Sequence, residues 1–347
     1  NGFYASVECI RRPELRDVPM AVCGDPGSRH GIILAKNERA KAYGIITTET
    51  VWQARAKCPQ LVLVVPHHDH YQEVSRKVNE IYAQYTDQVE PFGIDESWLD
   101  VTGSLHLFGS GEDIANTLRR RIQQELGLTI SVGVSFNKVF AKLGSDYKKP
   151  NATTVVSRDN YQRLLYPLPV TAMLYVGRSA AGVLGRHGVD TIGDLARLPR
   201  SQAQAMLGKS GEMIWEYANG LDESPVRTVE EQEEIKSVGN GLTFRRNLVG
   251  LEDVKAGILA LADTVARRLR EDGLQCQTLQ VQIKDPQFRL ISRQRPLPHA
   301  TNLATEMADA ALAIVQGSWD LAKPIRMLTI TGQNLTEQAA GRQLSLF

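Results

Sequence analysis

The sequence lacks the features that place a protein in a membrane, in the secretory pathway or around a zinc ion. None of its apolar runs approaches the roughly 18 residues of a membrane span, and its first residues do not form a signal peptide. Its four cysteines lie far apart, without CxxC or CxH spacing, at positions 9, 23, 58 and 276. Scattered cysteines indicate a reducing compartment, so we expect a cytoplasmic protein without a membrane partner.

An excess of charge of either sign is also absent. The 347 residues hold 40 Lys and Arg against 39 Asp and Glu, so the chain as a whole has no electrostatic signature of nucleic-acid binding, and any basic surface must be local. A P-loop is excluded as well, because Gly208-Lys209-Ser210 would need a glycine at position 203, where the sequence has Ala203. With 42% hydrophobic residues, the chain is long enough for two or more cores.

Among the features that are present, two adjacent acids, Asp95 and Glu96, are the most informative. A β-prone approach at 89–94 and a second run at 97–101 predict a tight hairpin with the acids at its apex. Neighbours on a regular strand point to opposite faces, so the two carboxylates can share a site only where the backbone bends. Together they suit Mg²⁺, which prefers one or two carboxylates with water and substrate phosphates; the alternative is a solvated turn.

A second cluster of candidate ligands is the run His67-His68-Asp69-His70. Three imidazoles and a carboxylate are chemically able to hold a metal ion. Contiguous residues rarely converge on one tetrahedral centre, however, and Asp69 is well placed to cap a helix that begins near Tyr71 and runs to about Tyr85. We therefore favour helix capping over metal binding.

The order of elements around the acids predicts an α+β fold. Apolar residues with helical periodicity occupy 111–126, a β-prone run follows at 129–134, and a further helix is expected at 138–143. We expect a sheet that presents the acids on its open face. Upstream, the pattern predicts strands at 18–23 and 31–35 and a helix at 38–43.

Residues 167–222 contain short helices and turn glycines but no expected strand. The segment 174–189 fits a helix-hairpin-helix, in which a glycine turn lets backbone N–H groups hold a DNA phosphate without reading the sequence. Gly177 and Arg178 lie at this turn, and Tyr175 stands where the first turn glycine is usual. We expect this segment to bind DNA through its backbone.

Beyond a charge-dense linker at 228–237, the pattern predicts a β-α-β-β-α-β unit over residues 238–338. Its expected elements are a strand to about 244, a helix at 251–272, strands at 277–283 and 289–295, a helix at 302–317 and a strand at 325–331. Arg289, Arg293 and Arg295 alternate along one expected strand, which would place them on one face. That face either follows a phosphate backbone or is an ordinary solvated surface.

Four segments, in this order and at matching spacing, resemble the Y family of translesion DNA polymerases, of the bacterial DNA polymerase IV type. They are Asn1-Gly2-Phe3-Tyr4-Ala5-Ser6-Val7-Glu8, Gly93-Ile94-Asp95-Glu96-Ser97-Trp98-Leu99-Asp100, Ser135-Phe136-Asn137-Lys138-Val139-Phe140-Ala141-Lys142 with Lys149-Pro150-Asn151, and Gln343-Leu344-Ser345-Leu346-Phe347. The resemblance covers the whole chain. It implies a multidomain right-hand polymerase with a palm (1–10 and 67–165), fingers (11–66), a thumb (166–227) and a little finger (238–338), followed by a clamp-binding tail (339–347).

The resemblance also implies roles for individual residues. Asp95 would bridge two Mg²⁺ ions and Glu96 would bind the ion that activates the primer 3′-hydroxyl for attack on a dNTP, with release of pyrophosphate. Tyr4 would be the steric gate that excludes a ribose 2′-hydroxyl. The other implied contacts are Gly2, Phe3, Tyr4, Lys41 and Lys149 with the triphosphate, Gly177, Arg178, Arg289 and Arg293 with primer–template DNA, and Gln343, Leu344, Leu346 and Phe347 with a sliding clamp. The alternative interpretation is that the terminal peptide is a frayed chain end without a binding role.

Two departures from the family pattern accompany the resemblance. The family's first metal aspartate would lie two residues before Asn1, and a molecule that began at Asn1 would be inactive. Many relatives have a triphosphate-binding Tyr followed three residues later by Arg, where this sequence has Glu38 and Lys41; Glu38 would repel a phosphate unless it turned away. Two hypotheses follow: a monomeric template-directed polymerase, favoured by Asp95, Glu96 and Tyr4, or a catalytically silent Y-family adaptor that binds DNA and the clamp.

Overall fold

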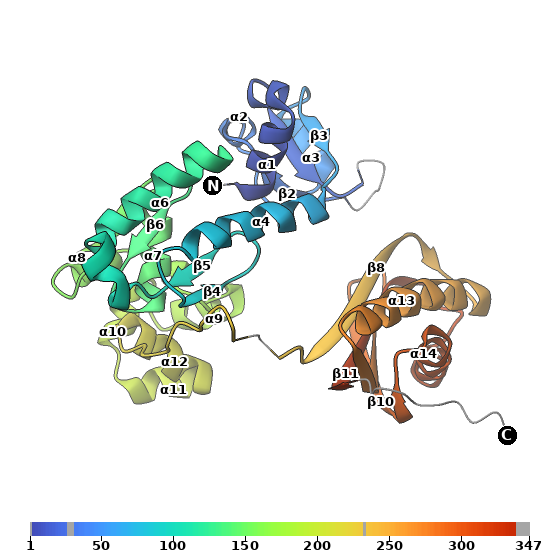
Figure 1. Ribbon diagram of the computed structural model, residues 1–347. Helices are drawn as coiled ribbons and strands as arrows, with labels where there is room; N and C mark the ends of the chain where they lie inside the picture. Colours follow the sequence, from blue (N-terminus) through green and yellow to red (C-terminus); the bar gives the residue numbers. More distant parts are fainter. Residues whose placement is uncertain (1, 26–30, 232–233, 338–347) are drawn as a thin grey trace. The chain divides into compact units, whose positions relative to one another are not determined.

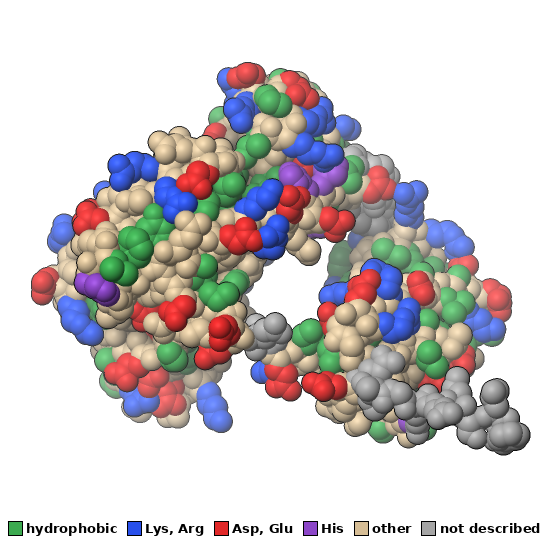
Figure 2. Space-filling model, viewed as in Figure 1, with side chains coloured by type: hydrophobic (Ala, Val, Ile, Leu, Met, Phe, Trp, Pro, Cys, Tyr) green, Lys and Arg blue, Asp and Glu red, His purple; other side chains and the backbone are tan. Residues whose placement is uncertain are grey.

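The structure is a computed structural model that describes residues 2–25, 31–231 and 234–337 (Figure 1). Contacts between residues divide the chain into two compact units, which within the described residues comprise 2–25 with 31–231, and 234–337. Side chains of both charges are interspersed over the face of each unit seen in Figure 2, as the balanced net charge predicts. A search of the described residues finds no helix with the length and apolar character needed to cross a membrane.

A small three-stranded sheet lies near the start of the first unit. β1 (Met20–Cys23) is central, antiparallel to β2 (Ile33–Lys36) and parallel to β3 (Val62–Val64). The helices of this segment are η1 (Pro13–Arg16), α2 (Glu38–Ala42) and α3 (Val51–Lys57). Asn37 joins β2 to α2: its side chain accepts the Ala40 N–H at 2.9 Å, and its amide donates to the Val18 carbonyl at 2.8 Å. The strands and helix expected here are therefore present.

The segment around the acids contains two separate pairs of strands rather than one continuous sheet. β4 (Val89–Pro91) and β5 (Ser97–Leu99) are antiparallel, and β6 (Val132–Val134) and β7 (Thr153–Val155) are parallel. The neighbouring helices are α1 (Phe3–Arg11), α4 (His68–Tyr82), η2 (Thr102–Ser104), α5 (Leu105–Phe108), α6 (Gly111–Leu126) and α7 (Lys138–Tyr147). The prediction of a single sheet is wrong, because β5 and β6 are not hydrogen-bonded to each other. Residues of both strands line one cavity instead.

The expected capping of α4 by Asp69 is also wrong. α4 begins at His68, with His67 as the residue before it, so Asp69 lies inside the first turn. The start is fixed by tertiary contacts: His67 Nδ1 lies 2.8 Å from Glu8 Oε1, and the Tyr71 hydroxyl donates to the same oxygen at 2.6 Å. These contacts with a fully buried carboxylate override the local capping preference. Within the described residues, no group of three or more His, Cys, Asp or Glu side chains is arranged to hold a metal ion.

Helix α7 packs directly on the backbone of β6 at Gly133. A Cβ atom at Gly133 would lie 1.9 Å from the Ala141 carbonyl oxygen and 2.5 Å from the Ser145 nitrogen. The first turn of α7 is capped by Asn137, whose side chain accepts the Phe140 N–H at 2.8 Å. The position of α7 relative to β6 is therefore fixed by backbone contacts, which leave no room for a side chain.

Replacing Gly133 by Ala is expected to lower the free energy of unfolding by about 3 kcal/mol, because the methyl group meets helix backbone that cannot rotate away. Urea denaturation measures the loss. Gly182→Ala is the matched control, since a Cβ at Gly182 in the exposed part of a helix meets nothing within 4 Å. It should leave stability unchanged or raise it by up to about 1 kcal/mol. Equal stability of the two variants would contradict the packing argument.

The rest of the first unit is helical, as expected for residues 167–222. Its elements are α8 (Tyr161–Leu165), η3 (Val170–Ala172), α9 (Arg178–Gly185), α10 (Ile192–Arg197), α11 (Arg200–Leu207) and α12 (Lys209–Ala218). Gly211 rests on the backbone of Ala203, where a Cβ would lie 1.9 Å from the carbonyl oxygen. The segment Gly208-Lys209-Ser210 thus joins two packed helices, in agreement with the rejection of a P-loop.

The second unit has the expected β-α-β-β-α-β order. Its elements are β8 (Ser237–Leu248), α13 (Leu251–Glu271), β9 (Leu274–Lys284), β10 (Leu290–Thr301), α14 (Ala304–Ser318) and β11 (Ile325–Glu337). The strands form an antiparallel sheet in the order β10-β9-β11-β8. The buried residues of its hydrophobic core come from α13, α14, β8, β9 and β11, and none comes from β10. The split β-α-β prediction is therefore confirmed.

The expected arginine stripe of this unit is only partly present. Arg289 precedes β10 and its Nε donates to Asp285 Oδ2 at 2.7 Å, so it lies in the turn rather than on the strand. Arg293 and Arg295 pair with Val281 and Leu279 in register, and directly opposed residues share a face. Because those two partners are buried in the core, both arginines lie at the edge of the helix-covered face. The prediction of one shared sheet face is therefore met by Arg293 and Arg295 but is wrong for Arg289, because its contact with Asp285 holds it in the turn before the strand.

Candidate active site

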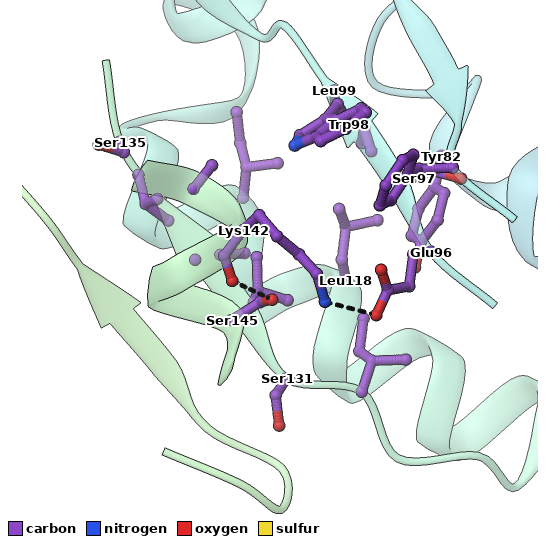
Figure 3. Close-up of a pocket in the computed structure, with 18 of the residues that line it drawn as sticks. Tyr82, Glu96, Ser97, Trp98, Leu99, Leu118, Ser131, Ser135, Lys142 and Ser145 are labelled. Carbon is purple, nitrogen blue, oxygen red and sulfur yellow. Dashed lines mark hydrogen bonds and ion pairs between the residues drawn. The ribbon is translucent and has the colours of Figure 1, made fainter. Parts of the chain in front are cut away.

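Asp95 and Glu96 lie together in the loop of the β4–β5 hairpin, as the sequence predicts. Val89 pairs with Leu99 and Pro91 with Ser97, and the Phe92 N–H donates to the Glu96 carbonyl at 2.8 Å. Both acids line one cavity of about 240 Å³. The cavity is bounded by β5, α6, the β6 segment and α7, and Gly2 and Lys149 also reach it (Figure 3). The bend therefore brings both carboxylates to the same space.

The chemistry of this pair fits a magnesium ion. Asp95 is exposed, and its carboxylate makes no hydrogen bond or ion pair with another described residue, so its hard oxygen atoms are available to a cation. Glu96 is half-buried beside it. Mg²⁺ typically takes one or two carboxylates and completes its shell with water and substrate phosphates. Two acids facing a cavity that a phosphate can enter meet that requirement.

Glu96 is the first member of a line of four charged side chains. Lys142 Nζ lies 2.6 Å from Glu96 Oε1 (Figure 3). It also lies 3.1 Å from Asp146 Oδ2, and Lys149 Nζ lies 2.7 Å from Asp146 Oδ1. Burial alone would lower the pKa of Lys142, but Glu96 and Asp146 outweigh it, so this pKa is raised. Burial alone would raise the pKa of Asp146, but Lys149 and Lys142 outweigh it, so this pKa is lowered. The pairing thus favours the charged forms of Lys142 and Asp146.

The hairpin is fastened to the start of α7 by a second, buried ion pair. Lys138 Nζ lies 2.5 Å from Glu90 Oε2 and 5.3 Å from the centre of the Trp98 ring, whose Nε1 donates to the Lys138 carbonyl at 2.9 Å. Burial would raise the pKa of Glu90, yet Lys138 and Arg227 hold it below its usual value. Sequence reasoning missed Glu90 and Lys142, because nothing in the sequence links residues almost 50 positions apart.

Tyr4 lies on α1 with its ring clamped by two aromatic neighbours. It stacks on Tyr71 at a centroid distance of 4.2 Å and an interplanar angle of 15°, and His68 meets it edge-on at 5.8 Å. Gly2, before α1, has a φ of 57°, in the left-handed region that glycine enters without strain. Phe3 lines a second, smaller cavity that also contains Asp95 and Glu96. The first turn of α1 therefore lies beside the acids, as the resemblance implies.

Lys41 and Lys149 are the two lysines expected to contact the triphosphate, and Lys36 lies near Lys41. Lys149 reaches the cavity, whereas Lys41 is exposed on α2 and lies 3.5 Å from Glu38. The Glu38 carboxylate is therefore paired with the Lys41 ammonium group, and Glu38 does not line the cavity. The pKa of Lys36 on β2 is lowered mainly by burial and, to a smaller extent, by the charge of Lys41. The carbonyl oxygen of Lys36 faces Gly2. Lys36 and Lys41 thus form a positive region next to the first turn of α1.

None of the expected DNA-binding positions is among the residues that line the cavity. Gly177 precedes α9 and Arg178 is its first residue, so both lie at the N-terminal end of this helix. Tyr175, at the usual glycine position, has a φ of 65° and a side chain that is 61% exposed. Arg289 and Arg293 belong to the second unit and are exposed. The clamp-binding positions Gln343, Leu344, Leu346 and Phe347 lie outside the described residues.

Comparisons with known proteins identify relatives over the full length of the chain. Residues 1–146 match the impB/mucB/samB family, and residues 235–346 match the C-terminal domain of that family. DNA polymerase IV of Acetivibrio thermocellus is 48% identical over 347 residues, which cover 100% of this chain and 87% of the relative. DNA polymerase IV of Moorella thermoacetica is 37% identical over 348 residues, covering 100% and 86%.

A similar fold is also found among solved structures. A Y-family DNA polymerase chimera superposes with a TM-score of 0.83 over 97% of each chain, at 22% sequence identity. The architecture expected from the sequence, a right-hand fold followed by a separate sheet domain, agrees with this match.

Proposed function

The chain belongs to the Y family of DNA polymerases, of the bacterial DNA polymerase IV type, and on this basis we propose how its residues carry out synthesis. It is a DNA-directed DNA polymerase of the translesion class, which binds primer–template DNA and dNTP and depends on a divalent metal. In the proposed assignment, residues 1–10 and 67–165 are the palm, 11–66 the fingers, 166–227 the thumb and 238–338 the little finger. What supports the assignment is the position of Asp95 and Glu96 in one loop facing one cavity.

Asp95 and Glu96 are the proposed metal ligands. Two Mg²⁺ ions bound there would supply positive charge to the attacking 3′-oxygen and to the leaving pyrophosphate. Asp95 would bridge both positions, which fits its exposed and unengaged carboxylate. Glu96 would serve the position next to the primer 3′-hydroxyl, where a cation would compete with Lys142 for the charge of its carboxylate. The Asp95–Glu96 loop is held in place by the ladder of β4 with β5, so little reorganisation accompanies binding.

Lys149, Lys41 and the backbone amides near Gly2, Phe3 and Tyr4 are the proposed triphosphate contacts. Lys149 and Gly2 line the same cavity as the acids, which supports this role. Lys41 would act as a monodentate cation from α2, with Glu38 turned toward Lys41 and away from the phosphates. The Tyr4 ring would exclude a ribose 2′-hydroxyl by occupying its space. Its stacking on Tyr71 supports a fixed ring position.

The N-terminal turn of α9 at Gly177 and Arg178 is the proposed contact with the duplex backbone. Free N–H groups at the first turn of a helix favour a phosphate oxygen. In the second unit, Arg293 is an exposed cation for a phosphate, and Arg289 would have to loosen its contact with Asp285 to take part. These contacts follow the DNA backbone and carry no sequence preference.

Primer extension separates this function from a silent adaptor. The full-length open reading frame should add the templated nucleotide to a primer in the presence of Mg²⁺, and the Asp95→Ala variant should not. Binding of primer–template DNA without any addition of nucleotide would support the adaptor and contradict the polymerase. The adaptor needs neither a metal-binding loop nor a sugar gate, which is why we prefer the enzyme.

The terminal segment Gln343–Phe347 is the proposed docking peptide for a sliding clamp, with a polar residue followed by spaced apolar groups. Tethering raises the local concentration of the enzyme at DNA without adding contacts to the polymerase. Deleting these five residues should therefore abolish clamp-stimulated synthesis and leave extension of bare primer–template within about twofold of the wild type. Equal loss in both assays would contradict the proposal.

A further inference from the structure

The charged line Glu96–Lys142–Asp146–Lys149 connects the two halves of the proposed site. Glu96 belongs to the metal-binding loop, and Lys149 to the triphosphate contacts. Between them, Lys142 contacts Glu96 at 2.6 Å and Asp146 at 3.1 Å, and Asp146 contacts Lys149 at 2.7 Å. Neither Lys142 nor Asp146 has a role in the function described above. Their position between the two binding groups indicates that they act on both.

We propose that Lys142 and Asp146 are positioning residues that couple cation binding at Glu96 to triphosphate binding at Lys149. The inference rests on the proposed function of Glu96 and Lys149. When a cation takes up the Glu96 carboxylate, Lys142 loses that partner and its charge turns to Asp146. Asp146 then holds Lys149 less strongly, and Lys149 becomes available to a phosphate.

Burial of the four side chains determines which contacts can change. The Lys142 side chain is 16% exposed, so its charge needs a carboxylate partner at all times. Asp146 and Lys149 are each 44% exposed, and ion pairs at such positions are weak. Lys149 can therefore leave Asp146 readily once Lys142 has moved toward it. The buried member of the line stays paired, and the exposed member is released.

The backbone around the line is fixed, so the exchange involves side chains alone. Lys142 and Asp146 are four residues apart on α7, one turn of helix, and therefore remain neighbours. α7 is held on β6 by the close contact at Gly133, and the Ser145 hydroxyl donates to the Lys142 carbonyl at 2.8 Å. The hairpin is fastened to the same helix through Trp98 and Lys138. Both ends of the line are thus presented by one rigid support.

A cycle of variants measures the coupling without any metal ion. Glu96→Gln removes the carboxylate charge, as a bound cation would neutralise it. Binding of a dNTP is titrated on primer–template DNA whose primer ends in a dideoxynucleotide, in EDTA, so that no bond can form. We expect Glu96→Gln to tighten dNTP binding about fivefold, the lower end of coupling between linked sites. In the Asp146→Asn background the same change should have no effect beyond about 1.5-fold, because the line is interrupted.

Three further variants distinguish coupling from simple charge removal. Asp100→Asn removes a carboxylate charge from the same hairpin, at a residue that does not line the cavity and accepts the Thr102 N–H instead, so it should change metal-free binding less than twofold. Lys142→Arg keeps the cation and should preserve the response to Glu96→Gln, whereas Lys142→Met should lose it. Asp146→Asn is nearly isosteric at an exposed position, so the central comparison does not depend on tolerance of a buried change.

Each outcome decides the proposal. A response to Glu96→Gln that persists in the Asp146→Asn background would show a direct effect of charge and overturn the coupling, as would the absence of any response to Glu96→Gln. Primer extension with Mg²⁺ by the unmodified protein is run in parallel. Normal extension together with an unresponsive cycle overturns the coupling alone, whereas a failure of extension counts against the proposed function.

Discussion

Changing Asp95 to Asn is expected to lower the rate of templated nucleotide addition by about a thousandfold, the loss typical of removing one preorganised electrostatic group. The Asp95 carboxylate is exposed, lines the cavity and makes no hydrogen bond or ion pair with another described side chain, so no described polar contact depends on its charge. Asparagine keeps the shape but cannot bridge two cations. The measurement is the single-turnover rate of adding one dNTP to a primer, with urea denaturation of the same preparation.

Asp100→Asn is the matched control, because it makes the same chemical change five residues further along the hairpin. Asp100 Oδ1 accepts the Thr102 N–H at 2.9 Å, a bond that an asparagine oxygen can also accept, and Asp100 does not line the cavity. Its rate should stay within about twofold of the wild type. A thousandfold loss in both variants would mean that the hairpin is merely sensitive to charge, and would remove the case for metal binding at Asp95.

The hairpin could be predicted because its information is local. Two β-prone runs flank a short acidic turn, and the ladder between Val89 and Leu99 follows directly from that spacing. The helices at 111–126 and 251–271 were likewise accessible, since both carry a long amphipathic pattern and buried residues at helical intervals. Elements whose stabilising contacts lie within a few residues are therefore recovered well from the sequence.

The contacts that organise the site are not local, and the sequence did not reveal them. Lys142 meets Glu96 across 46 positions, and Lys138 meets Glu90 across 48. The start of α4 depends on Glu8, which is almost 60 residues away from His67. Sheet register is of the same kind: the position of Arg293 opposite Val281 is fixed by pairing between strands, not by the composition of either strand. The wrong expectations about the sheet around the acids and the start of α4 both concern contacts of this type, whereas Arg289 is displaced by Asp285, four residues away.

These long-range contacts also explain why α7 is central to the site. One face of the helix rests on Gly133 of β6, Lys138 at its start holds the hairpin, and Lys142 one turn later meets Glu96. The helix then ends near Lys149, a proposed triphosphate contact. A single rigid element thus sets the distance between the acids and the lysine, which is the kind of preorganisation that electrostatic catalysis requires.

Replacing Tyr4 by Ala should reduce the preference for dNTP over rNTP by about a hundredfold, because a steric clash of about 3 kcal/mol with the 2′-hydroxyl is removed. The ring is held between Tyr71, stacked at 4.2 Å, and His68, edge-on at 5.8 Å, and therefore cannot easily turn aside for a ribose. Addition of dNTP should change much less than addition of rNTP. The measurement is the ratio of kcat/KM for the two nucleotides opposite one template base.

Tyr4→Phe distinguishes exclusion by the ring from recognition by the hydroxyl. Phenylalanine keeps the stacking on Tyr71 and the volume of the ring, so the dNTP preference should stay within about threefold of the wild type. If Tyr4→Phe lost as much preference as Tyr4→Ala, the discrimination would depend on a hydrogen bond of the phenol, and the steric interpretation would be wrong. A Tyr71→Ala variant should fall between the two, because removing the stacking partner leaves the Tyr4 ring present but free to rotate.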